Sequence, residues 1–189
     1  MNSLKTIAMT GFMGSGKSAI GARLADHFKI SFRDLDKMIE QGEQRLITDI
    51  FRDSGETYFR KIERNYFEKA VLESPLILAL GGGAMQQPEI GDYLKAHATT
   101  VYLDVPVKTL FERLRKCQNR PLLHDKSGKL LNAEALMHRI SRLLAEREPV
   151  YRRADITVTV QPEWTQEQTT KQLIKQLESH ASTAITEDS

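Results

Sequence analysis

The chain has 189 residues, of which 40% are hydrophobic and 28% are charged, as is ordinary for one soluble globular domain with a proper core. Its formal net charge is only +2, and Lys and Arg are interleaved with Asp and Glu, so nucleic acid is not an expected partner. The sequence contains no run of about 18 apolar residues that could span a membrane, and its N-terminal apolar stretch is too short for a signal peptide. A single cysteine, Cys117, fits a reducing compartment, and we therefore expect a cytoplasmic protein.

Five short apolar runs predict the strands of the domain. They lie at residues 6–9, 30–32, 76–80, 100–103 and 156–160. Most intervals between them show helical spacing, such as the stretch that starts at Thr57 and the stretch over 132–148, which ends before Pro149. Strands that alternate with helices predict an α/β fold, in which helices cover both faces of a parallel sheet. The last run alternates polar and apolar residues, as an exposed edge strand does.

The remaining segments set the limits of the domain. Residues 1–178 contain no internal repeat and no linker, so we expect one domain there, followed by a tail at 179–189 that lacks apolar periodicity and frays. The segment over about 115–131 is polar, contains Pro and Gly, and has no clear periodicity. A loop of this length inside a compact domain is usually functional, and we expect a mobile lid.

The first predicted strand leads into the sequence GFMGSGKS at 11–18, which satisfies the pattern G-x-x-x-x-G-K-[ST] between a strand and a helix. Glycines allow consecutive backbone amides to turn toward one anion, and the positive end of the following helix adds to the attraction. Lys17 can reach the β- and γ-phosphates of a nucleotide, and the Ser18 hydroxyl can bind Mg²⁺. The alternative is a glycine-rich turn that carries a surface lysine. The motif in its context predicts a phosphate-binding loop.

Other motifs narrow the class of phosphate-loop protein. The Asn-Lys-x-Asp motif that reads guanine in GTPases is absent from the sequence. A motor or transport ATPase usually ends its next central strand in Asp, whereas the strand expected at 76–80 runs into Gly81, Gly82 and Gly83. Glycines at the carboxyl end of a strand let a ligand approach the backbone closely. A small chain with a lid points to a kinase of nucleotides or small metabolites.

Asp34 and Asp36 follow the second predicted strand, at the sheet edge where the phosphate-binding loop is expected. In an extended stretch, residues i and i+2 face the same side. One carboxylate could then hold hydrated Mg²⁺ while the other accepts hydrogen bonds from a substrate hydroxyl. The alternative is a helix N-cap followed by an acidic residue in the first turn.

Three arginines that are far apart in the sequence complete the set of candidate site residues. They are Arg60 in a predicted helix, Arg120 in the expected lid and Arg147 near a helix end. Each alone could be a solvated charge, and Arg60 could form a plain surface ion pair with Glu63. Together they are typical of the planar clamps that hold a carboxylate or a phosphate.

In order and spacing these motifs resemble those of the shikimate kinase family, over about residues 6–160. The matching segments are GFMGSGKS at 11–18, DLD at 34–36, GE at 55–56 with FR at 59–60, GGG at 81–83, RPLL at 120–123 and REPVYRR at 147–153. GGG and RPLL separate this family from gluconate and adenylate kinases. The resemblance implies a three-layer P-loop kinase fold, with a five-stranded parallel sheet in the order 2-3-1-4-5 flanked by helices.

The resemblance also implies a donor half of the site, for ATP and Mg²⁺. Lys17, one of the expected catalytic residues, would serve the ATP phosphates, and Ser18 would serve the phosphates and the metal, which Asp34 would hold through water. The other expected nucleotide-binding residues are Gly11, Gly14, Ser15, Gly16, Ala19, Arg113, Arg120 and Pro162. Arg113 would stack on adenine, with Arg115 as an alternative, and Pro162 would close the other side of that pocket.

The acceptor half would bind shikimate. Asp36 would contact its hydroxyls and is the family's candidate base. The other residues at shikimate would be Arg60 and Arg147, for its carboxylate, and Gly82 and Gly83, whose backbone would face its ring. Arg120 would neutralise charge near the transferred phosphoryl group. The implied reaction is ATP-dependent phosphorylation of the 3-hydroxyl of shikimate, a step of chorismate and aromatic amino-acid biosynthesis.

Two other functions stay open at the level of the sequence. One is a kinase of another small hydroxy acid, such as gluconate, because arginines aimed at a carboxylate do not by themselves distinguish the two acids. The other is a non-catalytic ATP-binding switch, although a retired enzyme would be expected to have lost some of the site residues. No exposed apolar stripe in the sequence demands a partner, so we expect a monomer.

Overall fold

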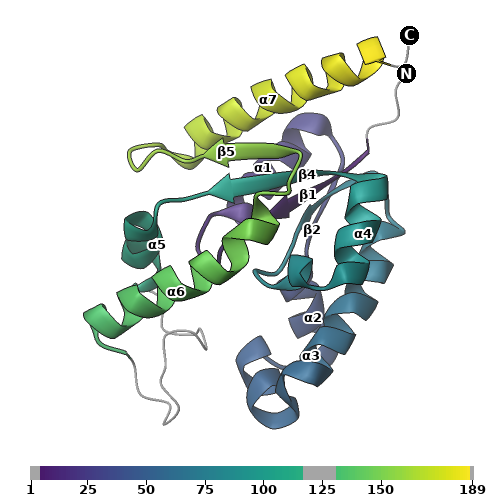
Figure 1. Ribbon diagram of the computed structural model, residues 1–189. Helices are drawn as coiled ribbons and strands as arrows, with labels where there is room; N and C mark the ends of the chain where they lie inside the picture. The colour runs from purple at the N-terminus through teal and green to yellow at the C-terminus, as the bar shows by residue number, and fades with distance from the viewer. Residues whose placement is uncertain (1–4, 117–130, 188–189) are drawn as a thin grey trace.

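The computed structural model describes residues 5–116 and 131–187, and a parallel sheet of five strands forms its middle layer (Figure 1). The strands are β1 (Thr6–Thr10), β2 (Ser31–Asp34), β3 (Leu76–Ala79), β4 (Ala98–Asp104) and β5 (Ile156–Thr159). Their order across the sheet is β2-β3-β1-β4-β5, with Ala8 of β1 opposite Leu78 of β3 and Thr100 of β4. This confirms the α/β fold that the sequence pattern predicted and the strand order that the family resemblance implied.

The place of each strand in the sheet explains its sequence. β1 and β3 lie inside the sheet and all of their residues are buried, which is why both are dominated by apolar side chains. β5 lies at one edge, where Ile156 and Val158 are buried and Thr159 is exposed. The prediction of an edge strand over 156–160 is therefore confirmed.

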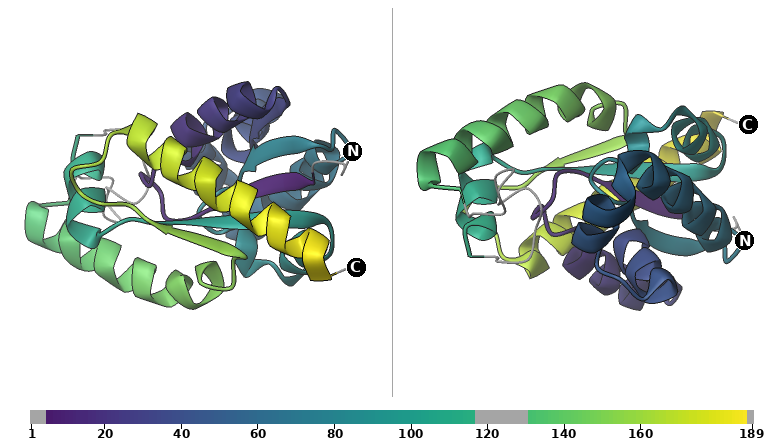
Figure 2. Two further views of the ribbon diagram at one scale, coloured as in Figure 1. Left: turned by 90° about the horizontal axis from the view of Figure 1, so that it is seen from above. Right: turned by 90° about the horizontal axis from the view of Figure 1, so that it is seen from below.

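Helices cover both faces of the sheet. They are α1 (Lys17–Phe28), α2 (Leu35–Glu43), α3 (Ile47–Val71), α4 (Pro88–His97), α5 (Val107–Leu114), α6 (Ala133–Tyr151) and α7 (Gln166–Glu187), with a short 3₁₀ turn η1 (Ala84–Gln86). Figure 2 shows α1 and α6 on opposite sides of the sheet. None of the helices in the described ranges is both long and apolar enough to cross a membrane.

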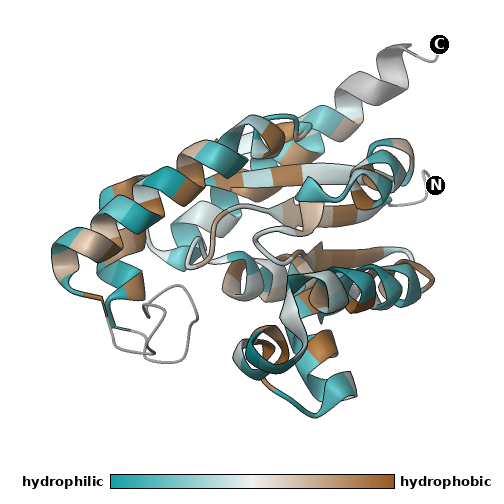
Figure 3. Ribbon diagram, turned by 60° about the horizontal axis from the view of Figure 1, so that its bottom comes forward, coloured by the Kyte–Doolittle hydropathy of each residue, from teal (hydrophilic) through white to brown (hydrophobic). Residues whose placement is uncertain are grey.

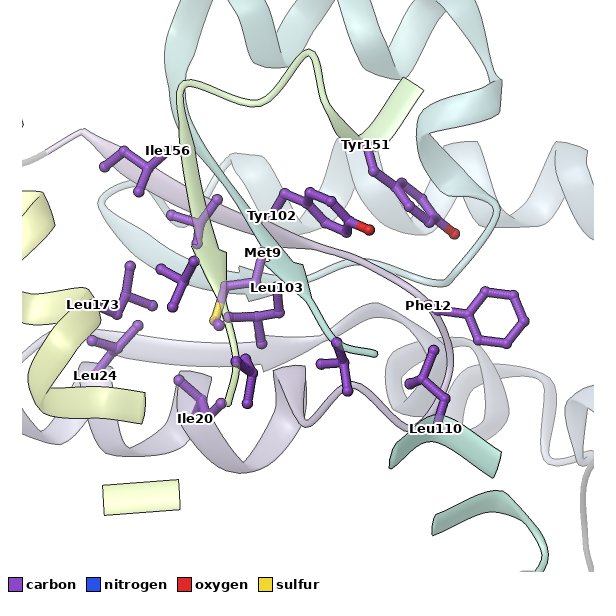
Figure 4. Close-up of a cluster of buried hydrophobic side chains, with 14 of the residues drawn as sticks. Met9, Phe12, Ile20, Leu24, Tyr102, Leu103, Leu110, Tyr151, Ile156 and Leu173 are labelled. Atoms are coloured by element: carbon purple, nitrogen blue, oxygen red, sulfur yellow. The ribbon is translucent and has the colours of Figure 1, made fainter. Parts of the chain in front are cut away.

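Two clusters of buried apolar side chains join the helices to the sheet. The larger one connects β1, β4 and β5 to α1, α5, α6 and α7, and includes Met9, Phe12 and Tyr151 (Figure 4). The smaller one lies between β3 and the helices α2 to α4, and includes Leu35 and Ile39. The helices contribute their apolar faces to these clusters, and in Figure 3 α6 accordingly alternates hydrophilic and hydrophobic bands.

α6 is longer than the sequence predicted. It does not end before Pro149 but continues to Tyr151. A proline inside a helix removes one backbone hydrogen bond, and near the C-terminus few turns depend on it. The last turn is still closed by the bond from Arg152 N to Glu148 O, at 2.9 Å. This extension matters for the site, because it places Tyr151 on the same helix as Arg147.

Two other helices also extend beyond the predicted ranges. α3 begins at Ile47 and is interrupted at Gly55, whose φ of 78° is unfavourable for other residues. α7 continues to Glu187, so residues 179–187 prolong a helix where the sequence predicted fraying. An anchored helix gains one hydrogen bond for each residue added, and this propagation needs no apolar periodicity. Of the expected lid over 115–131, residues 117–130 lie outside the described ranges.

Candidate active site

The segments singled out in the sequence meet at one edge of the sheet. Residues 11–16 follow β1, Asp34 ends β2, and residues 80–83 follow β3. β1, β2 and β3 are neighbours and parallel, so their carboxyl ends share an edge. Ligands of open α/β sheets bind in the crevice outside such an edge.

The loop after β1 has the backbone geometry of a phosphate cradle. Gly11, Gly14 and Gly16 have φ angles of 138°, 79° and 104°, which other residues rarely adopt. Gly16 is the N-cap of α1, so the loop ends where that helix presents its unpaired amides. A Cβ atom on Gly11 would lie 2.9 Å from the carbonyl oxygen of Leu103, so β4 leaves no room there for a side chain.

Lys17 and Ser15 supply polar groups inside this loop. Lys17 is buried, and its Nζ donates to the carbonyl oxygens of Gly11 at 2.8 Å and of Phe12 at 3.1 Å. Within the described residues, Ser15 Oγ is buried and has no hydrogen-bond partner. A buried hydroxyl without a partner is unfavourable, and a phosphate oxygen would satisfy it. The cradle, the ammonium group and this hydroxyl fit the phosphates of ATP.

Ser18 and Asp34 are in direct contact and supply oxygen atoms suited to Mg²⁺. The Ser18 hydroxyl donates to Asp34 Oδ2, while Asp34 Oδ1 accepts from the backbone of Lys37 at 3.3 Å and caps α2. In residues 5–116 and 131–187, no group of three or more His, Cys, Asp and Glu gathers as a metal site. Mg²⁺ commonly binds only one or two carboxylates, with substrate phosphates and water as its other ligands. A hydroxyl and one carboxylate beside the phosphate cradle fit that chemistry.

The two aspartates have the geometry of the alternative given above, a helix N-cap followed by an acidic residue in the first turn. Asp34 is the N-cap of α2, and Asp36 lies in the first turn of that helix, not in an extended stretch. Capping does not remove Asp34 from the site, because one carboxylate oxygen caps the helix and the other contacts Ser18. The Asp36 carboxylate lies beside Gly81, in the segment after β3.

Charged side chains pack directly on the backbone at two of the three glycines after β3. A Cβ atom on Gly81 would lie 2.7 Å from Asp36 Oδ1 and equally close to Glu63 Oε1. A Cβ atom on Gly83 would lie 2.6 Å from Arg60 Nη2. The glycines do permit close approach, as the sequence predicted, and here the groups that approach include the protein's own charged side chains.

Arg60 and Glu63 form a buried ion pair. Arg60 Nη1 lies 2.6 Å from Glu63 Oε2, and the Glu63 side chain is only 1% exposed. Gln87 Nε2 donates to the same oxygen at 2.7 Å, and Arg60 Nη2 also pairs with Glu56 at 3.1 Å. The interpretation of Arg60 and Glu63 as a plain surface pair is therefore wrong, because this face of α3 packs against the backbone after β3.

Burial and charge act in opposite directions on this pair. Burial raises the pKa of Glu63, whereas the charge of Arg60 opposes that rise and the charge of Asp36 adds to it. Burial disfavours the charged form of Arg60, but Glu63 and Glu56 outweigh it and raise the pKa of the guanidinium. Arg60 therefore stays protonated and is held between two carboxylates.

Arg147 and Tyr151 reach Gly82 from α6. Arg147 Nη1 donates to the Gly82 carbonyl oxygen at 3.2 Å, and its guanidinium lies 5.9 Å from the centre of the Phe12 ring. The Tyr151 hydroxyl, one helical turn further on, donates to the same oxygen. The sequence reasoning missed Tyr151, and the available signal was its spacing of one helical turn from Arg147. Because Arg147 and Arg60 both contact the backbone after β3, the structure brings these two predicted carboxylate ligands to one place.

Arg113, and not Arg115, lies beside the phosphate-binding loop. Arg113 Nη1 donates to the carbonyl oxygens of Gly14 at 3.0 Å and Ser15 at 3.2 Å, and burial lowers its pKa. Arg115 is 55% exposed and pairs within its own helix. Pro162 lies in an exposed turn after β5.

The remaining predicted residues divide between the described and the undescribed parts of the chain. Ala19 lies in the first turn of α1, immediately after Ser18. Arg120, expected to act from the lid, lies outside the described residues, as does Cys117.

Comparisons with known proteins agree with this geometry. A protein-family model described as shikimate kinase matches residues 13–178. A shikimate kinase of Chlorobium chlorochromatii is 43% identical over 152 residues, which cover 80% of this chain and 80% of that protein. The chain belongs to the shikimate kinase family. A shikimate kinase from Acinetobacter baumannii, solved in complex with shikimate, has a TM-score of 0.84 at 30% identity and covers 93% of this chain and 94% of its own.

A more distant match marks the limit of what fold similarity shows. A gluconokinase from Sinorhizobium meliloti covers 100% of both chains, with a TM-score of 0.58 and 15% identity. At that identity the likeness shows a common fold alone. Membership of the shikimate kinase family, by contrast, rests on the match of the family model over residues 13–178 and on the relative that is 43% identical over 152 residues.

Proposed function

We propose that this member of the shikimate kinase family transfers the γ-phosphoryl group of ATP to the 3-hydroxyl of shikimate, giving shikimate 3-phosphate and ADP. The observation that carries the proposal is the gathering of Asp36, Arg60 and Arg147 on the glycines after β3, at the same sheet edge as the phosphate-binding loop. The reaction belongs to chorismate and aromatic amino-acid biosynthesis. The similarity to a relative solved with shikimate supports this choice of acceptor.

On the donor side, the loop amides and Lys17 hold the phosphates of ATP. Ser18 and Asp34 would hold Mg²⁺, Asp34 through water, and the ion when bound would neutralise charge on the phosphate oxygens. The other nucleotide contacts are made by Gly11, Gly14, Ser15, Gly16 and Ala19 in the loop and the first turn of α1. Arg113 stacks on adenine, and Pro162 closes the opposite side of the adenine pocket.

On the acceptor side, Arg60 and Arg147 hold the carboxylate of shikimate, and the Gly82–Gly83 backbone lies against its ring. Two guanidinium groups match a planar carboxylate because each offers paired donors in a fixed geometry. Asp36 accepts hydrogen bonds from the shikimate hydroxyls and aligns the 3-hydroxyl with the γ-phosphorus. These contacts fix the acceptor before any bond is made or broken.

In the transfer itself, a bond forms between the 3-oxygen and the γ-phosphorus, and the bond from that phosphorus to the β,γ-bridging oxygen breaks. The proton of the hydroxyl passes late to Asp36. The transition state is loose, so catalysis consists mainly of positioning and of stabilising the spreading negative charge. Lys17 and Arg120 supply positive charge there, and closure of the lid excludes water that would otherwise hydrolyse ATP.

A coupled assay of ADP release tests the proposal against its two alternatives. The purified protein is given ATP and Mg²⁺ with shikimate, with gluconate, or with no acceptor. We expect ADP release to depend on shikimate. Equal or faster release with gluconate would identify a kinase of another hydroxy acid, and nucleotide binding without release in any arm would identify a non-catalytic switch.

We further propose that residues 1–178 act as one domain and that the protein is a cytoplasmic monomer. Support for one domain comes from the single sheet that unites the described strands. Support for the cytoplasm comes from the single cysteine, which fits a reducing compartment. Light scattering on the purified protein tests the monomer directly. A mass of twice 21.5 kDa would contradict it.

A further inference from the structure

Two donors from one face of α6 converge on a single carbonyl oxygen of the site. The Tyr151 hydroxyl and Arg147 Nη1 both donate to the oxygen of Gly82, the latter at 3.2 Å. Residues one helical turn apart lie on the same face of a helix, which lets both side chains reach the same point. A carbonyl oxygen has two lone pairs and can accept both hydrogen bonds.

The Tyr151 hydroxyl is held as a permanent donor. The side chain is fully buried, with 0% exposure, and its ring lies 5.3 Å from that of Tyr102 (Figure 4). Burial raises the pKa of Tyr151, although the charge of Arg147 opposes that rise. The phenol therefore keeps its proton at neutral pH and can donate one hydrogen bond.

The hydrogen bond sets the orientation of the central peptide of a turn, in which Ala84 N donates to the Gly81 oxygen at 3.1 Å and Gln86 N donates to the Gly83 oxygen at 3.0 Å. Neither of these turn bonds uses the Gly82 oxygen. Gly82 and Gly83 have no side chains, so their backbone has more conformational freedom than any other pair of residues would have. The peptide between them is planar and trans, so its carbonyl and its N–H point in opposite directions. Holding the Gly82 oxygen toward α6 also holds the Gly83 N–H away from α6. Arg147, bound to the same oxygen, is fixed together with the peptide.

We infer that Tyr151 is a positioning residue for the acceptor, whose hydroxyl sets the orientation of the Gly82–Gly83 peptide and the place of Arg147. Its hydroxyl donates to Gly82 and its ring packs against Tyr102, and neither of these residues belongs to the phosphate-binding loop. The inference rests on the proposed function, because it assumes that this peptide and Arg147 contact the acceptor carboxylate and ring. It predicts that loss of the hydroxyl weakens the binding of shikimate and leaves the binding of ATP unchanged.

The test is Tyr151→Phe in the full chain, with initial rates measured against shikimate and, separately, against ATP. The phenyl ring keeps the packing, and only the hydroxyl is lost. We expect the KM for shikimate to rise roughly three- to tenfold, the effect of losing one such hydrogen bond. The kcat and the KM for ATP should change less than about twofold.

Tyr102→Phe is the matched control. Tyr102 is also buried, and its ring packs at a tilt against that of Tyr151. Its hydroxyl donates to Asp104 Oδ1 at 3.4 Å, not to Gly82. If buried phenols served the structure alone, the two variants would show the same change in the KM for shikimate. Calorimetric titration of each variant with shikimate and with ADP gives a readout independent of turnover, and ADP binding reports the folded fraction.

The outcomes are distinct. A rise in the shikimate KM and Kd confined to Tyr151→Phe, with ADP binding intact, supports the inference. An unchanged shikimate Kd in that variant, an equal loss of ADP binding, or the same rise in Tyr102→Phe overturns it. If the unaltered protein releases no ADP with shikimate, the proposed function fails, whereas a positioning role that fails leaves that activity in place.

Discussion

Ser18 donates its hydroxyl to Asp34 across the gap between the first turn of α1 and the end of β2. The contact joins the phosphate-binding loop to the neighbouring strand through two oxygen ligands of the kind that Mg²⁺ prefers. The other carboxylate oxygen of Asp34 caps α2. One side chain thus serves both the stability of a helix and the proposed metal site, and the two roles can be separated by substitution.

Asp34→Asn is expected to keep the cap and to lose the metal ligand. Asn caps helices about as well as Asp, so the melting temperature should change little. The charge that attracts the ion is gone, and the Mg²⁺ concentration for half-maximal rate should rise about 10- to 100-fold. Initial rates against Mg²⁺ at fixed ATP measure this, with thermal denaturation alongside. An unchanged Mg²⁺ requirement would remove Asp34 from the metal site.

Asp36→Asn is expected to retain ATP binding and to lose phosphoryl transfer. The amide can still accept a hydrogen bond but cannot take the proton of the attacking hydroxyl, so kcat should fall about 10²- to 10⁴-fold. ADP binding by calorimetry and kcat by the coupled assay separate the two effects. Asp26→Asn, at an 85% exposed position on α1, is the control and should have normal turnover. Near-full turnover in Asp36→Asn would show that this carboxylate is not the base.

Contiguous motifs carried most of what could be predicted from the sequence. The residues from Gly11 to Ser18 need a particular backbone, and that backbone needs glycine at fixed positions, so the motif and its geometry imply each other. The strand order followed only from the resemblance to a family. Neither kind of evidence depended on how side chains from separate helices pack.

The burial of Arg60 with Glu63 and the contact of Tyr151 with Gly82 could not be predicted from the sequence. A spacing of three residues on a helix is the same for an exposed pair and a buried one, and only the packing of α3 on the backbone after β3 decides between them. The contact of Tyr151 with Gly82 depends on the continuation of α6 through Pro149. The one hydrogen bond that the proline removes was too small a loss to end the helix.

Gly83→Ala is expected to weaken the binding of the acceptor, shikimate, without harming the fold. Gly83 has a φ of −120°, which alanine adopts easily, but the new Cβ would lie 2.6 Å from Arg60 Nη2. The flexible guanidinium must move, and the KM for shikimate should rise about tenfold through loss of a charge-assisted bond. Kinetics against shikimate and ATP measure the difference.

Gly91→Ala is the matched control for that substitution. Gly91 lies inside α4, and a Cβ there would meet no atom within 4 Å. Alanine should stabilise the helix by about 0.5–1 kcal/mol and leave both KM values unchanged. A similar rise in the shikimate KM for the two variants would show that the effect of Gly83→Ala does not come from Arg60.

Arg60→Ala is expected to raise the KM for shikimate about 10- to 100-fold, because a guanidinium that holds the acceptor carboxylate is lost. It should also leave Glu63, which is 1% exposed, as an unpaired buried carboxylate, with a loss of about 3 kcal/mol of stability near neutral pH. Arg64→Ala is the control, since Arg64 pairs on the surface with Glu89, which is 60% exposed. It should lose less than about 1 kcal/mol and have a normal KM for shikimate.

The loss of stability in Arg60→Ala should depend on pH in a defined direction. Burial already raises the pKa of Glu63, and Arg60 opposes that rise, so removing Arg60 moves the pKa further up. A carboxyl whose pKa is raised on folding contributes stability that is complete below its unfolded pKa and is lost as pH rises through the folded pKa. The deficit of Arg60→Ala relative to the unaltered protein should therefore be small near about pH 5 and grow toward about pH 8. Thermal denaturation of both proteins across this range measures it, and a deficit independent of pH would show that Glu63 is not the group left unpaired.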